Sequence, residues 1–129
     1  MAIYDDVNIN VTQYIAETYK LLLDDGEIAE DTTEDEVIDY LYDIISDEYF
    51  GEEHWNFYTD QYRSIEAQMQ AYDAIKDDFG TLDYLYNKDS YGAQSEYEYG
   101  YIGMYIVLYK YYLDQNLSYI VDTFVSSQY

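Results

Sequence analysis

The sequence predicts an all-α protein, a compact bundle of five or six helices that forms a single acidic domain over residues 1–129. Apolar side chains recur every three or four residues along most of the chain, which is the spacing of one helix face. Proline is absent, and the six glycines lie mostly where the helical patterns stop. A chain of this length is long enough to bury one modest core.

The first two helices are predicted from their apolar spacing and their end signals. The first covers about residues 10–25 and stops at Gly26. The second begins after Thr33, which forms a capping-box pattern with Glu36, and it stops before Gly51. The apolar positions at helical spacing in the first helix are Val11, Ile15, Thr18 and Leu22, together with Tyr14 and Leu21.

The rest of the chain is predicted as three more helices and one irregular segment. A helix over about residues 60–79 stops at Gly80, and residues 87–100 form a loop or an irregular hairpin. Two helices over residues 101–113 and 116–126 complete the chain, although the aromatic content of residues 101–113 also suits a strand. The core side of the 60–79 helix is predicted to be Ile65, Met69, Tyr72, Ile75 and Phe79.

Twenty-eight acidic residues against five basic ones give the chain a net charge of −23. Self-repulsion at such a charge destabilises a compact state, so a protein that keeps it is expected to use its electric field. A disordered acidic tail is excluded, because the chain is 49% hydrophobic and 20% aromatic, with 21 tyrosines. Salt adaptation is an alternative explanation, but it gives no reason for so many large aromatic side chains.

One helix carries the most specific charge pattern. Asp35, Asp39, Asp43 and Asp47, here called the acidic row, follow one another at i, i+4 spacing. Each pair of like charges at this spacing destabilises a helix by about 0.2–0.5 kcal/mol. No lysine or arginine occurs over residues 26–62 to offset the repulsion. The pattern predicts a phosphate-mimicking contact surface, with an ordinary solvated helix face as the alternative. The opposite, core-facing side of the helix is predicted to hold Val37, Ile38, Leu41, Ile44 and Ile45.

Other acidic and aromatic residues are predicted to extend the contact surface. Tyrosine and tryptophan combine a large apolar body with a polar tip, which suits surfaces that become buried on contact and that bind cations. The further acidic candidates are Asp24, Asp25, Glu52, Glu53, Asp77 and Asp78. The aromatic candidates are Tyr40, Tyr42 and Trp55. Tyr105, Tyr109, Tyr112 and Tyr119 are instead predicted at the edge of the core.

No pattern for catalysis, cofactor binding or a metal centre occurs in the sequence. Cysteine is absent and His54 is the single histidine, which leaves no thiolate site and no histidine pair. Calcium loops, phosphate-binding loops and nucleophile elbows are also missing. We therefore expect a protein that is not an enzyme, uses no cofactor, and does not enter a membrane. Residues 1–6 lack the basic and apolar parts of a signal peptide, which predicts a cytoplasmic location in a bacterial cell.

Three segments resemble the Ocr family, phage-encoded DNA mimics that block type I restriction enzymes. They are Tyr4-Asp5-Asp6-Val7, the Thr33-led helix with Val37-x-Asp39-x-Leu41, and His54-Trp55-Asn56-Phe57-Tyr58. The resemblance covers the first half of the chain, and the tyrosine content here is much higher. It implies a helical inhibitor that occupies a DNA-binding groove, often as a dimer. Phage anti-CRISPR proteins form a broader class of inhibitors that act on host nucleic-acid-binding complexes in the same way.

Two classes of function follow as hypotheses. The first is a non-catalytic nucleic-acid mimic that occupies the DNA- or RNA-binding channel of a basic host protein, such as a CRISPR effector, a restriction complex or a repair enzyme. Such a protein would not bind nucleic acid itself, because both are negative. The alternative is an acidic immunity or chaperone-like protein that binds a basic toxin or another basic partner. A homodimer is left open, with residues 105–113 and 120–125 as its expected interface.

Overall fold

The computed structural model describes residues 2–61, 64–88, 90–91, 93 and 100–129. Over these ranges it contains six helices and no strand, which confirms the predicted all-α class. The helices are α1 (Ala2–Asp24), α2 (Glu34–Phe50), α3 (Glu52–Gln61), α4 (Ile65–Ile75), α5 (Phe79–Asn87) and α7 (Gly100–Gln128).

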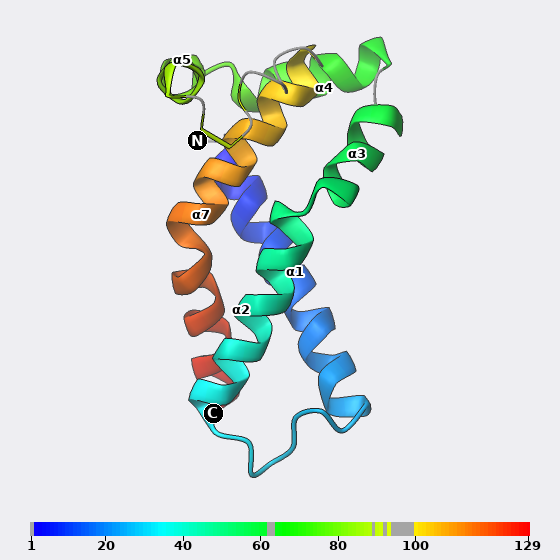
Figure 1. The fold of residues 1–129 in the computed structure, drawn as a ribbon, viewed down its shortest axis with the longest axis vertical. Helices are drawn as coiled ribbons and strands as arrows, with labels where there is room; N and C mark the ends of the chain where they lie inside the picture. The colour runs from blue at the N-terminus through cyan, green and yellow to red at the C-terminus, as the bar shows by residue number, and fades with distance from the viewer. Residues whose placement is uncertain (1, 62–63, 89, 92, 94–99) are drawn as a thin grey trace.

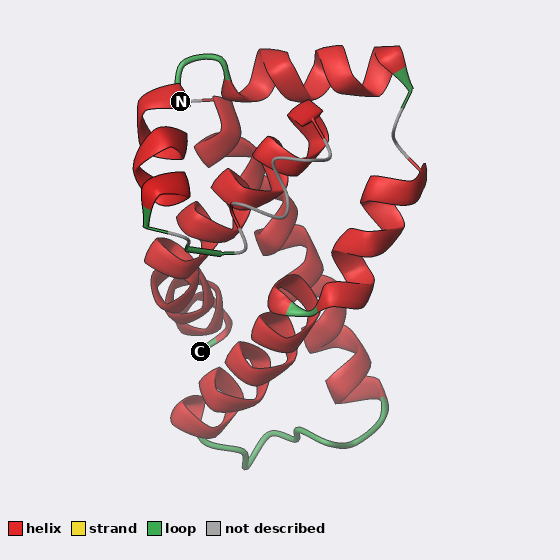
Figure 2. Ribbon diagram, turned by 45° about the horizontal axis from the view of Figure 1, so that its top comes forward, coloured by secondary structure: helices red, strands yellow, loops and turns green. Residues whose placement is uncertain are grey.

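Three long helices form an elongated bundle, and the shorter helices cover one end of it. α1 and α7 run in the same direction and pack against each other, and α2 runs the opposite way and packs mainly against α7 (Figure 1). α4 and α5 lie across the end that holds the N-terminus and pack against α7 (Figures 1 and 2). The C-terminus reaches the other end, where the Tyr129 hydroxyl donates to the Thr32 carbonyl at 3.0 Å.

The core is built from apolar residues at helical spacing. Along α1 the side chains of Ile3, Val7, Val11 and Ile15 are fully buried at successive i+4 positions. α2 contributes Val37, Leu41 and Ile45 from one face. Burial of each such side chain stabilises the fold by about 1.5–3 kcal/mol, which offsets the repulsion between the surface acids.

The first two helices largely confirm their predictions. α1 begins at Ala2, eight residues before the expected start, because Ile3 and Val7 continue its buried side. The capping box of α2 is formed: the Glu36 N–H donates to Thr33 Oγ1 at 3.3 Å, and the Thr33 N–H donates to Glu36 Oε2 at 3.4 Å. α2 ends at Phe50, directly before Gly51.

The predicted single helix over residues 60–79 is wrong, because this part of the chain is divided among α3, α4 and α5. The Ser64 hydroxyl accepts from the Ala67 N–H at 3.1 Å and starts α4 there. Gly80 lies inside α5 and does not end a helix. Ile65 and Met69 are 84% and 50% exposed, against the prediction that they belong to the core.

The reason for the exposed Ile65 and Met69 is the way α4 packs. Its buried side consists of Ala71 and Ile75, with Ala67 partly buried against the same core. This alanine side of α4 packs against α7, so the larger apolar residues of α4 are turned outward. The choice between these two faces depends on α7 and is not encoded in α4 alone.

The two predicted C-terminal helices are one helix of 29 residues. Asp114 and Gln115, where a break was expected, are exposed helical residues with no glycine or proline beside them. The predicted homodimer interface is also wrong, because most of residues 105–113 and 120–125 are buried within the bundle. The strand alternative for residues 101–113 is excluded. The predicted loop or hairpin at 87–100 mostly lies outside the described residues.

Candidate partner-binding surface

The acidic row is exposed along the whole of α2. All four aspartates face solvent, while Val37, Leu41 and Ile45 on the opposite side are at most 1% exposed. Successive carboxylates are about 6 Å apart along the helix axis and turned by about 40°. In the described part of the chain, none of the four is within ion-pair distance of a lysine or arginine. The helix therefore presents a slowly winding line of uncompensated negative charge.

The acids are unevenly distributed over the folded surface. Residues 24–64 contain fifteen of the 28 acidic residues and one basic residue, Arg63. Residues 7–23 of α1, in contrast, contain only Glu17 and Lys20. α7 contributes two acids and one lysine over its 29 residues. The strongest negative field thus lies around α2 and the loop before it, a concentration that the sequence analysis missed.

The side formed by α1 and α7 has little charge, and we call its exposed residues the neutral face. A shallow groove of about 350 Å³ between the two helices has no charged side chain in its lining. The exposed large apolar side chains of these two helices include Ile9 at 56% and Tyr119 at 70%. The lining residues are Asn8, Thr12, Tyr119, Ile120, Thr123, Phe124 and Ser127. This face is a natural control surface for tests of the acidic row.

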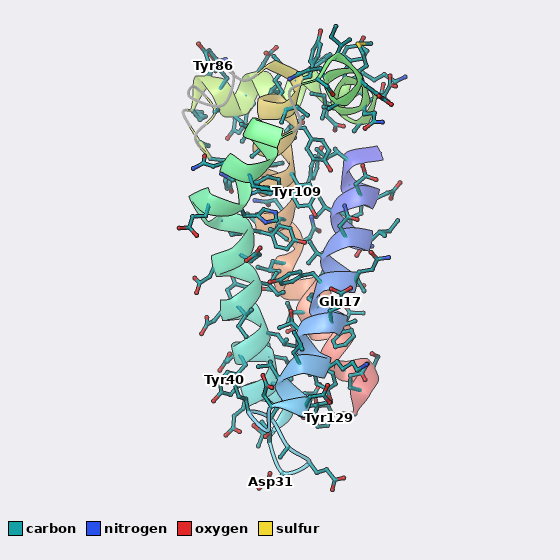
Figure 3. The ribbon with its side chains drawn as sticks, turned by 90° about the vertical axis from the view of Figure 1, so that its right-hand side faces the viewer. Glu17, Asp31, Tyr40, Tyr86, Tyr109 and Tyr129 are labelled. Atoms are coloured by element: carbon teal, nitrogen blue, oxygen red, sulfur yellow. The ribbon has the colours of Figure 1, made fainter. Side chains whose placement is uncertain are left out.

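The other predicted acids fall into separate places. Asp24 and Asp25 are exposed at the end of α1, beside the acidic loop whose tip holds Asp31 and which leads into α2 (Figure 3). Asp77 is exposed in the turn between α4 and α5, at the opposite end of the bundle. Glu53 is exposed on α3. The side chain of Glu52 lies outside the described residues. Asp24 and Asp25 therefore lie at the end of the bundle where α2 begins, and Asp77 lies at the other end.

Asp78 is not a surface residue. Only 3% of it is exposed, and the Tyr112 hydroxyl donates to its Oδ1 at 2.7 Å. Within the described ranges its Oδ2 has no hydrogen-bond partner. Burial and the Asp78 carboxylate raise the pKa of Tyr112 to about 12. The prediction of Asp78 as a partner contact is therefore wrong, because Tyr112 holds the carboxylate in the interior.

The aromatic candidates also divide. Tyr40 and Tyr42 are 49% and 38% exposed on α2, as predicted, and Tyr40 projects from the bundle in Figure 3. Trp55 is only 4% exposed, and its indole N–H donates to the Tyr49 carbonyl. It is an interior residue that joins α3 to the end of α2, so the prediction that it forms an exposed contact is wrong.

The Tyr112 hydroxyl can be tested as the partner of the buried carboxylate. We expect Tyr112→Phe to destabilise the protein by about 1–3 kcal/mol, because it leaves Asp78 buried without its donor. Urea unfolding followed by circular dichroism measures the effect. The control is Tyr119→Phe, on a tyrosine that is 70% exposed, with an expected change within about 0.5 kcal/mol. Equal effects of the two substitutions would contradict this role.

Alkaline pH should destabilise the fold through its tyrosines. Burial and neighbouring negative groups raise the pKa values of Tyr91 and Tyr112 to about 12 and also raise that of Tyr109. These phenols stay protonated in the folded chain at a pH where the unfolded chain ionises. Their stabilising contribution is complete below about pH 10 and is lost as the pH rises from about 10 to 12. Urea unfolding at stepped pH, with tyrosinate absorbance recorded in parallel, checks this; constant stability over that range would contradict it.

Two other kinds of site are not found. Among the side chains that the structure describes, no group of three histidine, aspartate or glutamate residues is placed to hold a metal ion. None of the helices in the described ranges is both long and apolar enough to cross a bilayer. What this surface offers a partner is therefore charge and aromatic contact.

No protein family, curated protein or solved structure matches this chain. The resemblance to the Ocr family remains a prediction, and the function has to be argued from the chain's own surface.

The uncompensated charge makes stability depend on salt. We expect the melting temperature to rise by about 5 °C between about 0.01 M and 0.5 M NaCl, because the Debye length falls from about 30 Å to below 10 Å. Differential scanning calorimetry measures the rise. The Asp39→Lys, Asp43→Lys double variant should show a smaller rise, since it carries less net charge. A melting temperature that salt leaves unchanged would mean that self-repulsion is weak.

Proposed function

We propose that this protein is a non-catalytic inhibitor that imitates the backbone of a nucleic acid. The acidic row is the observation that carries the proposal. Its carboxylates are exposed, have no lysine or arginine within ion-pair distance among the described residues, and are held on one face of a helix whose other face is anchored in the core. Successive carboxylates are about 6 Å apart along the helix axis, whereas one strand of a duplex carries a charge about every 3.4 Å. The row therefore imitates the backbone at about half its charge density.

The partner of such a surface is a basic protein that normally holds DNA or RNA. A CRISPR effector, a restriction complex or a repair enzyme of a bacterial host has a channel of this kind. Long-range attraction would bring the two proteins together, and the exposed Tyr40 and Tyr42 beside the row would become buried on contact. The protein would act in the bacterial cytoplasm by occupying the channel, with no reaction and no cofactor.

One observation favours a second candidate function. The charge is concentrated around α2 and the neutral face carries little of it, so the binding surface is on one side only. An immunity or chaperone-like protein that covers one patch of a basic toxin needs no more than that. A mimic that inserts into a closed channel would use a field on several sides. The two functions differ in what competes for the partner.

Competition with nucleic acid tests the proposal directly. The tagged protein is used to capture partners from a bacterial lysate, and the captured material is washed with duplex DNA, with RNA, or with NaCl. Mimicry predicts that one nucleic-acid-binding complex is retained at low salt and displaced by DNA or RNA at nanomolar to micromolar concentration. A partner that salt releases but nucleic acid does not displace would support the immunity or chaperone function instead.

A further inference from the structure

A small pocket lies where the C-terminal end of α2 meets α1, α3 and α7. Its volume is about 160 Å³, and it differs from the rest of the surface in being lined mainly by rings. Tyr109 reaches into the space between the helices at this level in Figure 3. We call it the aromatic pocket. Its lining residues are Asn10, Tyr49, His54, Trp55, Tyr105 and Tyr109.

The walls of the aromatic pocket are held rigidly by ring contacts. Tyr49 and Tyr109 stack with centroids 5.7 Å apart and planes at 14°, and Trp55 meets Tyr109 edge-on at 5.3 Å. These three side chains are at most 7% exposed, so their positions are fixed by the core. Tyr105 continues the wall, with its centroid 5.7 Å from that of Tyr109. Several tyrosine and tryptophan rings around one space form a site that attracts cations through their π systems.

A carboxylate stands at the edge of this pocket. Glu48 Oε1 lies 3.0 Å from Nδ1 of His54, a lining residue, and the Glu48 side chain is 40% exposed. Burial and the nearby Glu48 carboxylate both raise the pKa of Tyr14, whose ring packs edge-on against Tyr49. Glu48 directly follows Asp47, the last member of the acidic row. Each position along a helix turns the side chain by about 100°, so Glu48 is directed toward the core side of α2 and away from the acidic row. The aromatic pocket therefore carries a negative charge at its rim, at the same end of α2 as Asp47.

We propose that the aromatic pocket binds the guanidinium group of an arginine side chain from the partner. This inference rests on the proposed function, because a protein that holds nucleic acid presents arginines to phosphates. A guanidinium is planar and weakly hydrated, so it stacks on aromatic rings while its N–H groups donate to a carboxylate. The ammonium of lysine is compact and strongly hydrated, and it gains less from such a site. Glu48 supplies the carboxylate at the rim, and Asn10 is a polar residue of the lining.

The site can be tested without the partner. Trp55 is the only tryptophan, so ¹⁵N-labelled protein gives one indole N–H signal, from a residue in the pocket wall. We titrate it with N-acetyl-arginine amide, with the lysine equivalent, and with the uncharged citrulline equivalent, all at constant ionic strength. We expect a saturating shift with the arginine compound at millimolar concentration, several-fold weaker binding of the lysine compound, and none of the citrulline compound.

Two matched variants of α2 distinguish specific binding in the aromatic pocket from nonspecific attraction of cations to the acidic protein. Glu48→Gln and Asp35→Asn each remove one charge from α2, but only the first lies at the pocket. We expect Glu48→Gln to weaken binding of the arginine compound about tenfold and Asp35→Asn to change it by less than twofold. Shifts that stay linear, that are the same for arginine and lysine, or that fall equally in both variants would overturn the proposal, since accumulation of cations around an acidic protein explains them.

Failure of this inference is distinguishable from failure of the proposed function. If the arginine compound binds but nucleic acid does not displace the captured partner, the arginine site is supported and nucleic-acid mimicry is contradicted. If the partner is displaced by DNA while the indole signal shows no saturable shift, the pocket is refuted and mimicry stands. A partner complex that is equally tight with Glu48→Gln and with the unchanged protein would also overturn the anchoring role.

Discussion

Reversal of the two central charges of the acidic row should abolish most partner binding while the fold is kept. Asp39→Lys with Asp43→Lys is expected to weaken the complex by about 100-fold or more, because truncation of one member of a buried, hydrogen-bonded charge pair already costs about 2–5 kcal/mol. Stability should change little or increase. The new lysines would stand four residues from Asp35 and Asp47, which replaces two repulsive pairs with attractive ones worth about 0.2–0.5 kcal/mol each.

The measurement is the dissociation constant for the captured partner, beside the urea unfolding curve of each variant. A milder pair then separates position from total charge. Asp39→Asn with Asp43→Asn and Thr12→Lys with Thr123→Lys both change the net charge by two, but the second pair lies on the neutral face. We expect only the asparagine pair to weaken binding strongly. Equal losses from both pairs would show that net charge, and not the acidic row, determines affinity.

The largest loss of stability is expected at Tyr109. Tyr109→Ala should destabilise the protein by about 3–5 kcal/mol, the usual range for removal of a large buried ring. Tyr109 is 3% exposed and contacts Tyr49 of α2, Trp55 of α3 and Tyr105 of its own helix. Its loss would therefore remove packing contacts among three helices at the level where they meet. Urea unfolding monitored by circular dichroism gives the free-energy difference.

Tyr40 provides the matched control for this substitution. Tyr40→Ala removes the same side chain from an exposed position on α2 and should change stability by no more than about 0.5 kcal/mol. Tyr40→Ala should weaken partner binding more than Tyr109→Ala does, since Tyr40 lies beside the acidic row. Tyr109→Phe keeps the ring and should cost only about 1 kcal/mol, the value of a hydroxyl's hydrogen bond. Similar costs for Tyr109→Ala and Tyr40→Ala would contradict the interior role of Tyr109.

Tyrosine has two distinct uses in this protein. Tyr40 and Tyr42 are exposed beside the acidic row, where a partner can bury them. Tyr49 and Tyr109 are core residues that stack on each other, and Tyr112 holds a buried carboxylate. Tyr109 and Tyr112 are predicted from the sequence at the edge of the core, and in the structure they lie within it, 3% and 8% exposed. Tyr119, from the same prediction, is 70% exposed at the groove between α1 and α7.

Properties that depend on near neighbours in the chain were predictable from the sequence. The capping box at Thr33, the extent of α2 and the exposure of the acidic row follow from contacts three or four residues apart, which are already present in the sequence pattern. The all-α class follows from the same periodicity. Because proline is absent and the apolar side chains recur at helical spacing, the chain has few alternatives to helices.

Properties that depend on contacts between distant residues could not be predicted in this way. Asp78 is buried because Tyr112, 34 positions later, donates to it, and no feature near Asp78 distinguishes it from the exposed Asp77. Trp55 is buried because Tyr49 and Tyr109 surround it. The aromatic pocket is formed by residues from α1, α2, α3 and α7, so no single segment indicates it.

Helical periodicity, the strong negative charge, its concentration over residues 24–64 and the regular row of aspartates can all be read from the chain. Packing decides which acids and rings remain at the surface, and that the weakly charged sides of α1 and α7 form one neutral face. These differ because helix periodicity is a local property of the chain. Burial and electric field instead depend on which helices pack together, and that is set by the whole core.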